Sequence, residues 1–334
     1  MRPVQHGNGV RAATGADSVD LSVLMPCYNN GTSVATNIGT VLRDLEMVLP
    51  LTFELVVIDD GSTDGTHEEA RRAVARDPRV RLVRVPSNSG KGAALRSGFD
   101  VSQGDLVCFL DGDLQISARN IPRFIEYLRL EAVDVVVSSK RHPLSTVDYP
   151  RTRRILSRWF QLLTTTLFGL PLTDTQAGLK VFRREVLERI IPRSLVKRYA
   201  FDVELLSNVH RLGYRITEAP IRIHARRTYE SHVNLRAVMR MFRDTMGIFY
   251  RMYITRYYDR IDPPKPGQQQ TDVWDQKING WPPTPYVLDL LELSWTKAEA
   301  SEPKIEKTPN VFLNSPDRTL RNPTSANTSE SDSQ

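Results

Sequence analysis

Strand-like and helical patterns alternate from about Asp20 to Ile223, and this alternation restricts the fold more than any other feature of the sequence. The strand-like runs are rich in Val, Ile and Leu and almost continuously apolar, as in strands that helices cover on both faces. Such an alternation predicts an α/β fold with a covered sheet. The predicted strands are residues 21–28, 53–60, 80–85, 105–111, 132–139 and 216–223. The predicted helices are residues 33–47, 66–76, 92–102, 121–130, 153–168 and 201–212.

Composition divides the 334 residues into four parts. Residues 1–18 are small and polar and are expected to form a flexible arm, whereas residues 19–230 form the α/β domain. Residues 231–260 carry six arginines, two aspartates and apolar residues at helical spacing, which predicts a basic amphipathic helix. Residues 261–334 are mostly of low complexity, which predicts a largely disordered tail with one candidate docking segment at 274–295.

The charge balance indicates a partner that carries phosphate. The chain has 45 Lys and Arg against 39 Asp and Glu, a net charge of +6. This suits a nucleotide, an anionic membrane surface or a nucleic acid. A nucleic-acid partner is not expected, because no interleaved aromatic and basic residues support it. The two cysteines exclude a disulfide framework and favour reduced thiols in the cytoplasm. No run reaches the roughly 18 apolar residues that span a bilayer.

Two segments place polar residues directly after predicted strands, where ligands bind in open α/β sheets. Residues 22–30 end in Pro26, Tyr28 and Asn30, and Pro26 removes a backbone donor, so the following residues can face a ligand or form a simple turn. Residues 56–66 deliver Asp59 and Asp60 at a strand end. Asp60 can satisfy turn amides or bind a ligand, whereas the Asp59 carboxylate can accept from a base imide such as uracil N3–H.

Two further motifs point to phosphate and to a metal. Lys91 lies between two glycines at the start of a predicted helix, where amides and an ammonium favour phosphate, although an ordinary loop fits as well. Asp111, Gly112 and Asp113 follow a strongly apolar strand. Two carboxylates forced together repel unless a cation lies between them or they bind protons. Hard divalent cations such as Mg²⁺ or Mn²⁺ prefer oxygen ligands, and Gln115 adds a neutral oxygen.

Taken together, residues 26–30, 56–66, 88–99 and 109–115 resemble the inverting glycosyltransferases of family 2, which have the GT-A, Rossmann-like fold. Residues 138–158, 174–185 and 199–206 are similar to the polyprenyl-phosphate hexose synthases, a group that includes dolichyl-phosphate β-glucosyltransferases and dolichyl-phosphate mannose synthases. The DTQAGLK segment resembles the glucosyl branch more closely. The resemblance covers about residues 20–232 and implies a single GT-A domain with a mixed, mostly parallel sheet.

The resemblance also implies roles for individual residues. Asp111, Asp113 and Gln115 would hold Mg²⁺ or Mn²⁺, and Lys91 would lie near the nucleotide. The other implied donor-site residues are Pro26, Tyr28, Asn30, Asp59, Asp60 and Gly112. The implied acceptor-phosphate residues are Arg141, Arg153, Ser157 and Arg226. Ser139 and Lys140 replace the Gly-Ser that usually precedes the arginine, and residues 229–232 depart from the family's G-x-S-K.

These residue types suit direct displacement at the anomeric carbon of a sugar. A phosphate monoester has its second pKa near 6, so it needs no strong base at neutral pH, but it needs cations such as Arg141 and Arg158. The expected catalytic residues are Asp113, Arg141 and Asp174, and Asp174 could bind sugar hydroxyls or orient Lys180. A hydroxyl acceptor would instead need a base, for which Asp174 and Asp202 are the candidates.

We therefore expect a hexosyltransferase that moves glucose from UDP-glucose to a polyprenyl phosphate. The alternatives are a GDP-mannose-dependent mannose synthase, a family 2 transferase with a hydroxyl acceptor, and a non-catalytic protein that binds nucleotide sugars. The expected location is peripheral, on the cytoplasmic face of the membrane. Residues 231–260 would bind the anionic membrane surface, or a membrane protein would bind residues 274–295.

Overall fold

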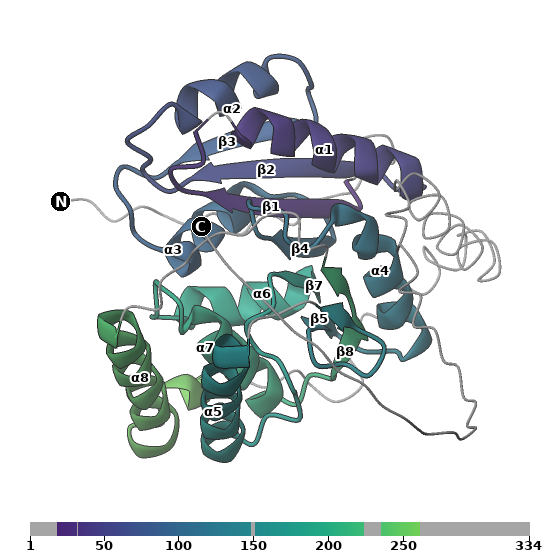
Figure 1. Ribbon diagram of the computed structural model, residues 1–334. Coiled ribbons are helices and arrows are strands. Elements are labelled where there is room, and N and C mark those ends of the chain that lie inside the picture. The colour runs from purple at the N-terminus through teal and green to yellow at the C-terminus, as the bar shows by residue number, and fades with distance from the viewer. Residues whose placement is uncertain (1–18, 32, 148–150, 224–234, 261–334) are drawn as a thin grey trace, which may run out of the picture. The chain divides into compact units, whose positions relative to one another are not determined.

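The computed structural model describes residues 19–31, 33–147, 151–223 and 235–260 (Figure 1). The predicted arm, the predicted tail and its docking segment lie outside the described residues, and so does Arg226. The boundaries expected for the four parts of the chain therefore stay predictions.

A seven-stranded sheet with the order β3-β2-β1-β4-β7-β5-β8 forms the centre of the described region. Its strands are β1 (Leu21–Cys27), β2 (Phe53–Asp59), β3 (Val80–Arg84), β4 (Leu106–Leu110), β5 (Val135–Ser139), β7 (Leu179–Arg183) and β8 (Ile216–Pro220). The first four run parallel, β7 is antiparallel to both β4 and β5, and β8 is parallel to β5. This mixed, mostly parallel α/β sheet confirms the predicted fold class.

Eight α-helices are present in the described residues. They are α1 (Ser33–Val48), α2 (Thr66–Val74), α3 (Lys91–Val101), α4 (Ile121–Leu130), α5 (Arg151–Phe168), α6 (Arg184–Ile190), α7 (Phe201–Arg211) and α8 (Leu235–Phe249). A small separate sheet pairs β6 (Thr146–Val147) with β9 (Arg222–Ile223).

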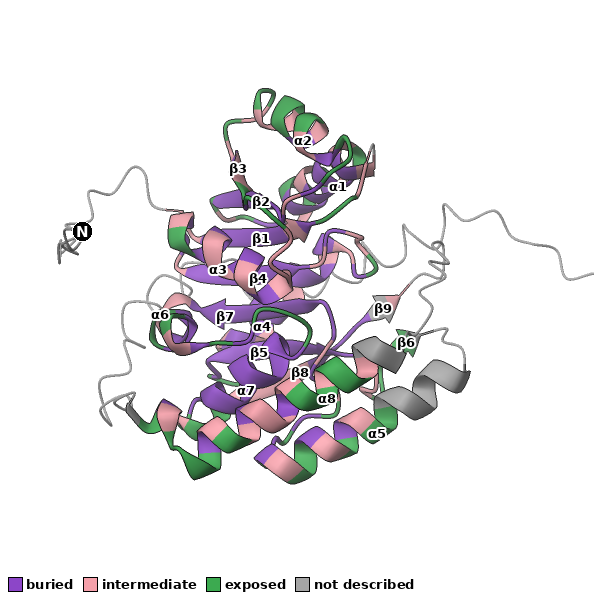
Figure 2. Ribbon diagram, turned by 90° about the vertical axis from the view of Figure 1, so that its left-hand side faces the viewer, coloured by how far each residue is buried: buried purple, intermediate pink, exposed green. Residues whose placement is uncertain are grey.

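Two apolar cores flank the main sheet, because successive side chains of a strand point to opposite faces. Leu24 and Phe109 belong to the core that α3, α6 and α7 complete. Val23 and Cys108 belong to the core that α1 and α4 complete. Figure 2 shows the central strands as continuously buried, which explains why their sequences do not alternate between apolar and polar residues. Both cysteines are free and buried.

The sequence analysis missed β7 and α6, which lie between the predicted helices at 153–168 and 201–212. β7 contains Lys180 and Arg183. Two cationic residues among five are not typical of a buried strand, so the sequence pattern did not indicate one, although all five residues are buried. The exposed fraction of Lys180 is only 1%. Its ammonium is buried because Asp202 of α7 pairs with it at 2.8 Å.

The predicted helix at 231–260 is divided in the structure. The described part begins with α8, continues as a single π-helical turn η3 (Tyr250–Ile254) and ends in a 3₁₀ turn η4 (Tyr257–Arg260). Arg256 has a φ of +48° between the two turns. Ile248, Met252 and Tyr258 pack into the core beside α7. Among the described helices, none combines the length and the apolar character that crossing a membrane requires.

Candidate active site

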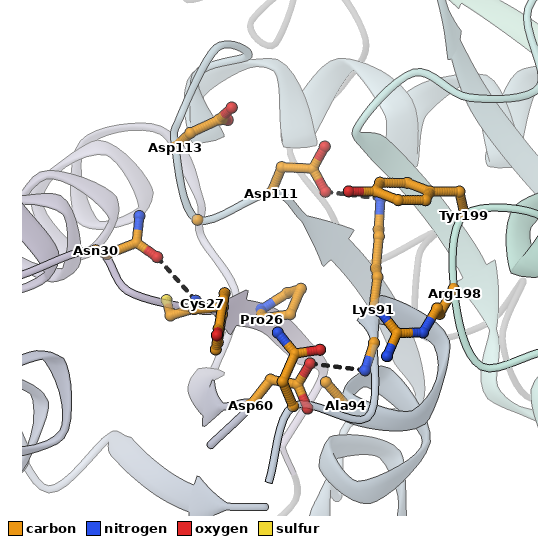
Figure 3. Close-up of a pocket in the computed structure, with 14 residues that line it drawn as sticks. Pro26, Cys27, Asn30, Asp60, Lys91, Ala94, Asp111, Asp113, Arg198 and Tyr199 are labelled. Carbon is orange, nitrogen blue, oxygen red and sulfur yellow. Dashed lines mark hydrogen bonds and ion pairs between the residues drawn. The ribbon is translucent and has the colours of Figure 1, made fainter. Parts of the chain in front are cut away.

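A cavity of about 450 Å³ lies where β1, β2 and β4 end, on the side at which α3 begins (Figure 3). Parallel neighbours end at the same edge of a sheet, so their following residues converge there. The lining residues are Pro26, Cys27, Tyr28, Asn30, Asp60, Asn88, Gly90, Lys91, Ala94, Asp111, Gly112, Asp113, Arg198 and Tyr199. All of the predicted donor-site residues except Asp59 are among them.

Gly112 allows the end of β4 to pass close to the end of β1. A Cβ at this position would lie 2.7 Å from the carbonyl oxygen of Pro26 and 2.9 Å from Cys27 Sγ. The Asn37 side chain donates to the Gly112 carbonyl at 2.8 Å and fixes this turn to α1. The glycine therefore sets the positions of the two carboxylates on either side of it.

Gln115, which was expected to bind a metal together with Asp113, forms hydrogen bonds to the Asp113 side chain in this structure. Gln115 donates to Asp113 twice, from its backbone N–H at 3.2 Å and from its side-chain amide at 2.8 Å. Burial and the charge of Asp111 nevertheless raise the pKa of Asp113. Gln115 thus orients Asp113 in this structure, and the charge of the two neighbouring carboxylates is incompletely compensated.

Lys91 supplies the cation that faces Asp111. Its ammonium lies 2.7 Å from Asp111 Oδ1 and 3.6 Å from Asp202 Oδ2. Burial by itself would lower the pKa of Lys91, but Asp111 and Asp202 keep that pKa above its ordinary value. Figure 3 shows the Lys91 side chain reaching along the pocket to Asp111, with Arg198 and Tyr199 on the same side.

The structure separates the two aspartates at the end of β2. Asp60 lines the pocket and accepts from the backbone N–H groups of Ser89 and Gly90 at 2.9 and 2.8 Å, so it holds the loop before Lys91. Asp59 is fully buried and accepts from Ser62 N at 2.9 Å. Asp59 does not line the pocket in this structure, and its carboxylate lies 3.1 Å from His67, so its expected contact with a nucleotide base stays a prediction.

The end of β1 presents an aromatic ring and an inert thiol. Tyr28 has an exposed fraction of 45%, and its backbone N–H donates to Asn30 Oδ1 at 2.9 Å. Burial, with added effects of Asp59 and Asp113, raises the pKa of Cys27 to about 12. The thiol stays protonated at neutral pH, so Cys27 does not supply a nucleophile.

Two turns on the other side of Asp111 hold the residues expected at the acceptor. Lys140 N donates to Asp174 Oδ2 at 3.2 Å, and Arg141 Nη1 donates to the Thr173 carbonyl at 3.1 Å. Lys140 lines a second, small hollow together with Asp111. The structure thus brings Arg141 and Asp174 together, beside the carboxylates but outside the main pocket.

The remaining expected acceptor residues are only partly placed. Arg153 and Ser157 lie in the first half of α5, and their side chains are outside the described residues, as is all of Arg226. Orienting Lys180 was one of two roles considered for Asp174, the other being to bind sugar hydroxyls. Lys180 has other partners in the structure. It donates to the Ala177 carbonyl at 2.7 Å and pairs with Asp202.

Three features of the site were missed by the sequence analysis. Gly178, directly before β7, leaves room for the Asp111 carboxylate, since a Cβ there would lie 2.2 Å from Asp111 Oδ2. Arg198 and Tyr199 reach the pocket from the loop before α7. Only the glycine in the DTQAGLK segment gave a local signal. The loop is distant in the sequence from the other pocket residues.

A divalent cation fits the donor atoms at the end of β4. Asp111 and Asp113 offer hard carboxylate oxygens at the pocket surface, and the pKa of Asp113 is raised by burial and by the charge of Asp111, both of which a bound cation would offset. Within the described part of the chain, no cluster of three or more His, Cys, Asp or Glu side chains could hold a metal. A diphosphate and water would supply further ligands, as is common for Mg²⁺.

Solved structures with a similar fold support the GT-A assignment. Mannosyl-3-phosphoglycerate synthase of Rubrobacter xylanophilus aligns with a TM-score of 0.56 at 19% identity, over 76% of this chain and 80% of that one. Glucosyl-3-phosphoglycerate synthase of Mycobacterium tuberculosis, in complex with Mn²⁺, UDP and glucosyl-3-phosphoglycerate, aligns with a TM-score of 0.53 at 24% identity, over 70% and 79%.

Relatives found by sequence similarity indicate which glycosyltransferases this chain resembles. Glycosyltransferase AglD of Haloferax volcanii is 32% identical, over 63% of this chain and 34% of its own length. Dolichyl-phosphate beta-glucosyltransferase of Dictyostelium discoideum is 30% identical, over 61% and 66%. Undecaprenyl-phosphate mannosyltransferase of Micrococcus luteus is 32% identical, over 63% and 86%. The chain thus spans less than two thirds of the length of the first two.

The family profile for glycosyl transferase family 2 matches residues 22–191, about half of the chain, and includes β1, β2, β4 and the two carboxylates of the pocket. Since this match, the relatives and the fold agree, the chain belongs to glycosyltransferase family 2.

Proposed function

We propose that this chain transfers glucose from UDP-glucose to a polyprenyl phosphate, on the cytoplasmic face of a membrane and with Mg²⁺ or Mn²⁺. The observation that carries the proposal is the placement of Asp111 between two sites. On one side is the 450 Å³ pocket with Lys91, and on the other the turn with Lys140, next to Arg141. A nucleotide sugar in the pocket would present its anomeric carbon near this basic turn.

The donor half of the proposal rests on the pocket. Tyr28 offers an exposed ring for a base, and Lys91, the first residue of α3, offers a cation for a diphosphate. Bound at Asp111 and Asp113, a divalent cation would supply positive charge that stabilises the leaving diphosphate. The Mycobacterium structure with Mn²⁺ and UDP has the same fold, which is consistent with these ligands.

The acceptor half rests on Arg141 and its neighbours. Relatives whose names specify dolichyl phosphate or undecaprenyl phosphate support a polyprenyl phosphate as the acceptor. Guanidinium groups bind phosphate through two parallel hydrogen bonds. An acceptor phosphate oxygen would attack the anomeric carbon, and the bond from that carbon to the diphosphate oxygen would break. UDP leaves and the configuration inverts, with no proton to be removed from a dianionic phosphate.

With a phosphate acceptor, Asp174 positions the turn that carries Arg141 and does not serve as a base. Its carboxylate accepts from Lys140 N and Gln176 N, at 3.2 and 3.0 Å, and thereby fixes the turn that carries Arg141. With a phosphate acceptor, loss of Asp174 should weaken acceptor binding. With a hydroxyl acceptor, loss of the same group should remove the base and lower kcat by about 10²–10⁴-fold.

Release of UDP that depends on the acceptor tests the proposal. Purified full-length protein with Mn²⁺ would receive UDP-glucose or GDP-mannose, together with a short polyprenyl phosphate or the matching polyprenol. We expect UDP release and a glucosylated lipid phosphate only when UDP-glucose and the polyprenyl phosphate are supplied together. Asp113→Asn should abolish release, and Asp100→Asn, an exposed carboxylate on α3, should not.

Other outcomes select the alternatives. Release of GDP would keep the chemistry and change the donor to GDP-mannose, which the similarity to the Micrococcus mannosyltransferase favours as the second candidate. Turnover with the polyprenol would assign a hydroxyl acceptor. Tight binding of UDP without turnover of any pair would indicate a protein that only binds nucleotide sugars.

A further inference from the structure

A single ammonium in this site faces two carboxylates. Lys91 Nζ lies at hydrogen-bond distance from Asp111 Oδ1, at 2.7 Å, and farther from Asp202 Oδ2, at 3.6 Å. Lys180 already pairs with the other Asp202 oxygen, Oδ1, at 2.8 Å. Asp202 Oδ2 therefore has Lys91 as a partner that is close but not yet in a short hydrogen bond.

The backbone around Lys91 is fixed, so any movement must occur in its side chain. Gly90 has a φ of +96°, and a Cβ there would lie 2.6 Å from the Lys197 carbonyl. Gly92 N donates to the same carbonyl at 2.8 Å, and a Cβ at Gly92 would lie 2.5 Å from the Phe201 ring. The four-carbon stem of lysine can still rotate and shift the ammonium by about an ångström.

A divalent cation and the Lys91 ammonium compete for Asp111. Gly178, directly before β7, packs closely against Asp111 Oδ2, since an added Cβ would lie 2.2 Å away, and this packing limits how far the carboxylate can turn from Lys91 to meet a second cation. Two cations on one carboxylate oxygen repel each other. Binding of a metal at Asp111 therefore requires a second place for the ammonium, and Asp202 Oδ2 offers one.

We propose that Lys91 is an exchangeable counter-cation, which neutralises Asp111 in the metal-free site and moves to Asp202 when a divalent cation binds. Asp202 is then a positioning residue, and Lys180 keeps it charged. The inference rests on the proposed metal site at Asp111 and Asp113, and not on the identity of the sugar or acceptor. After the nucleotide and the metal leave, return of Lys91 would again neutralise Asp111.

Binding of Mn²⁺ without nucleotide tests the exchange, followed by the electron paramagnetic resonance signal of free Mn²⁺ during titration of the full-length protein. Lys91→Met removes the competitor and should tighten Mn²⁺ binding about tenfold, if the ion pair contributes about 1.4 kcal/mol. Lys197→Met removes an exposed ammonium from the adjacent loop and should change binding by less than about twofold.

The role of Asp202 is tested by a double-mutant cycle. Asp202→Asn should weaken Mn²⁺ binding where Lys91 is present, because the ammonium then has only Asp111. The same substitution should have little effect in the Lys91→Met background. Since Asp202→Asn leaves Lys180 buried without a carboxylate, Asp202→Asn combined with Lys180→Met provides a second variant that strands no buried charge.

The outcomes separate this inference from the proposed function. Mn²⁺ binding that is unchanged or weaker in Lys91→Met, with UDP release intact in the wild type, overturns the exchange alone. If Asp202→Asn changes Mn²⁺ binding equally in the wild-type and Lys91→Met backgrounds, Asp202 does not take part in the exchange. Absence of Mn²⁺ binding in both the wild type and Lys91→Met overturns the exchange together with the metal site.

Discussion

Burial and the neighbouring carboxylate of Asp111 raise the pKa of Asp113 above that of an ordinary aspartate. A carboxyl group whose pKa is higher in the folded chain binds more protons when folded. Folding stability therefore falls as the pH rises from the unfolded pKa to the folded pKa. At neutral pH this loss of folding stability acts in full on the metal-free protein, and a bound divalent cation would offset it.

We predict that Asp113→Asn raises the melting temperature of the metal-free protein at pH 7 by a few degrees, while abolishing sugar transfer. The asparagine can still accept from the backbone N–H of Gln115. The difference should shrink as the pH falls to about 4, where the wild-type carboxyl group is protonated more often. Differential scanning fluorimetry in EDTA at both pH values measures this. A lower melting temperature for the variant at pH 7 would contradict the prediction.

Gly178→Ala should disturb the metal site through steric contact alone. The new Cβ would lie 2.2 Å from Asp111 Oδ2, and the Lys91 ion pair opposes a shift of that carboxylate. We predict that the affinity for UDP in the presence of Mn²⁺ falls at least tenfold, with a smaller change without metal; isothermal titration calorimetry measures both.

Gly39→Ala is the matched control for this substitution. Gly39 lies in α1 and has no atom within 4 Å of an added Cβ. Alanine should stabilise the helix by up to about 1 kcal/mol and leave UDP binding unchanged. Equal affinities in Gly178→Ala and Gly39→Ala would show that Asp111 is free to move.

At the scale of elements, the strands that could be predicted are those with a clear local pattern of apolar and polar residues in the sequence. β1, β2 and β4 are continuous apolar runs followed by polar residues, so their ends and eight of the nine predicted donor-site residues could be read from the sequence. β7 could not be, because Lys180 is buried only through a partner that lies 22 positions later in the chain. The position of the Asp59 carboxylate depends likewise on His67 and Arg84.

The loop before α7 depends on elements on both sides of it. Glu204 is fully buried and accepts from Leu195 N at 3.0 Å and from Val196 N at 2.8 Å. The Tyr258 hydroxyl of η4 donates to the same carboxylate. The segment after α8 therefore holds the loop that carries Arg198 and Tyr199 into the pocket.

Tyr258→Phe should loosen this loop. Loss of the hydroxyl leaves Glu204 with one donor fewer and should lower the free energy of unfolding by about 1–2 kcal/mol. We predict a higher KM for the donor with little change in kcat, measured by UDP release. Tyr257→Phe makes the same chemical change at the neighbouring position and should alter neither parameter. Unchanged KM in Tyr258→Phe would remove η4 from control of the pocket.

At the scale of the molecule, the described region carries one surface that suits the proposed membrane location. α5 and α8 lie side by side in both views (Figures 1 and 2) and contact each other. Their exposed apolar side chains are Trp159, Leu162, Met239 and Phe242. Exposed arginines on the same helices are Arg158, Arg240 and Arg243. We define these seven residues as the α5–α8 surface, and this mixture suits an anionic lipid surface.

We predict that the full-length protein sediments with vesicles that contain phosphatidylserine and much less with vesicles of phosphatidylcholine alone. Binding should weaken as salt rises from about 0.1 M to about 1 M, because the Debye length then falls from about 10 Å to about 3 Å. Trp159→Ser combined with Phe242→Ser removes apolar contact and should reduce binding at both salt concentrations. Leu130→Ser, whose side chain is as exposed on α4 as those of the α5–α8 surface, is the control and should bind as the wild type does. Equal binding by the double variant and the wild type would assign the attachment to another part of the chain.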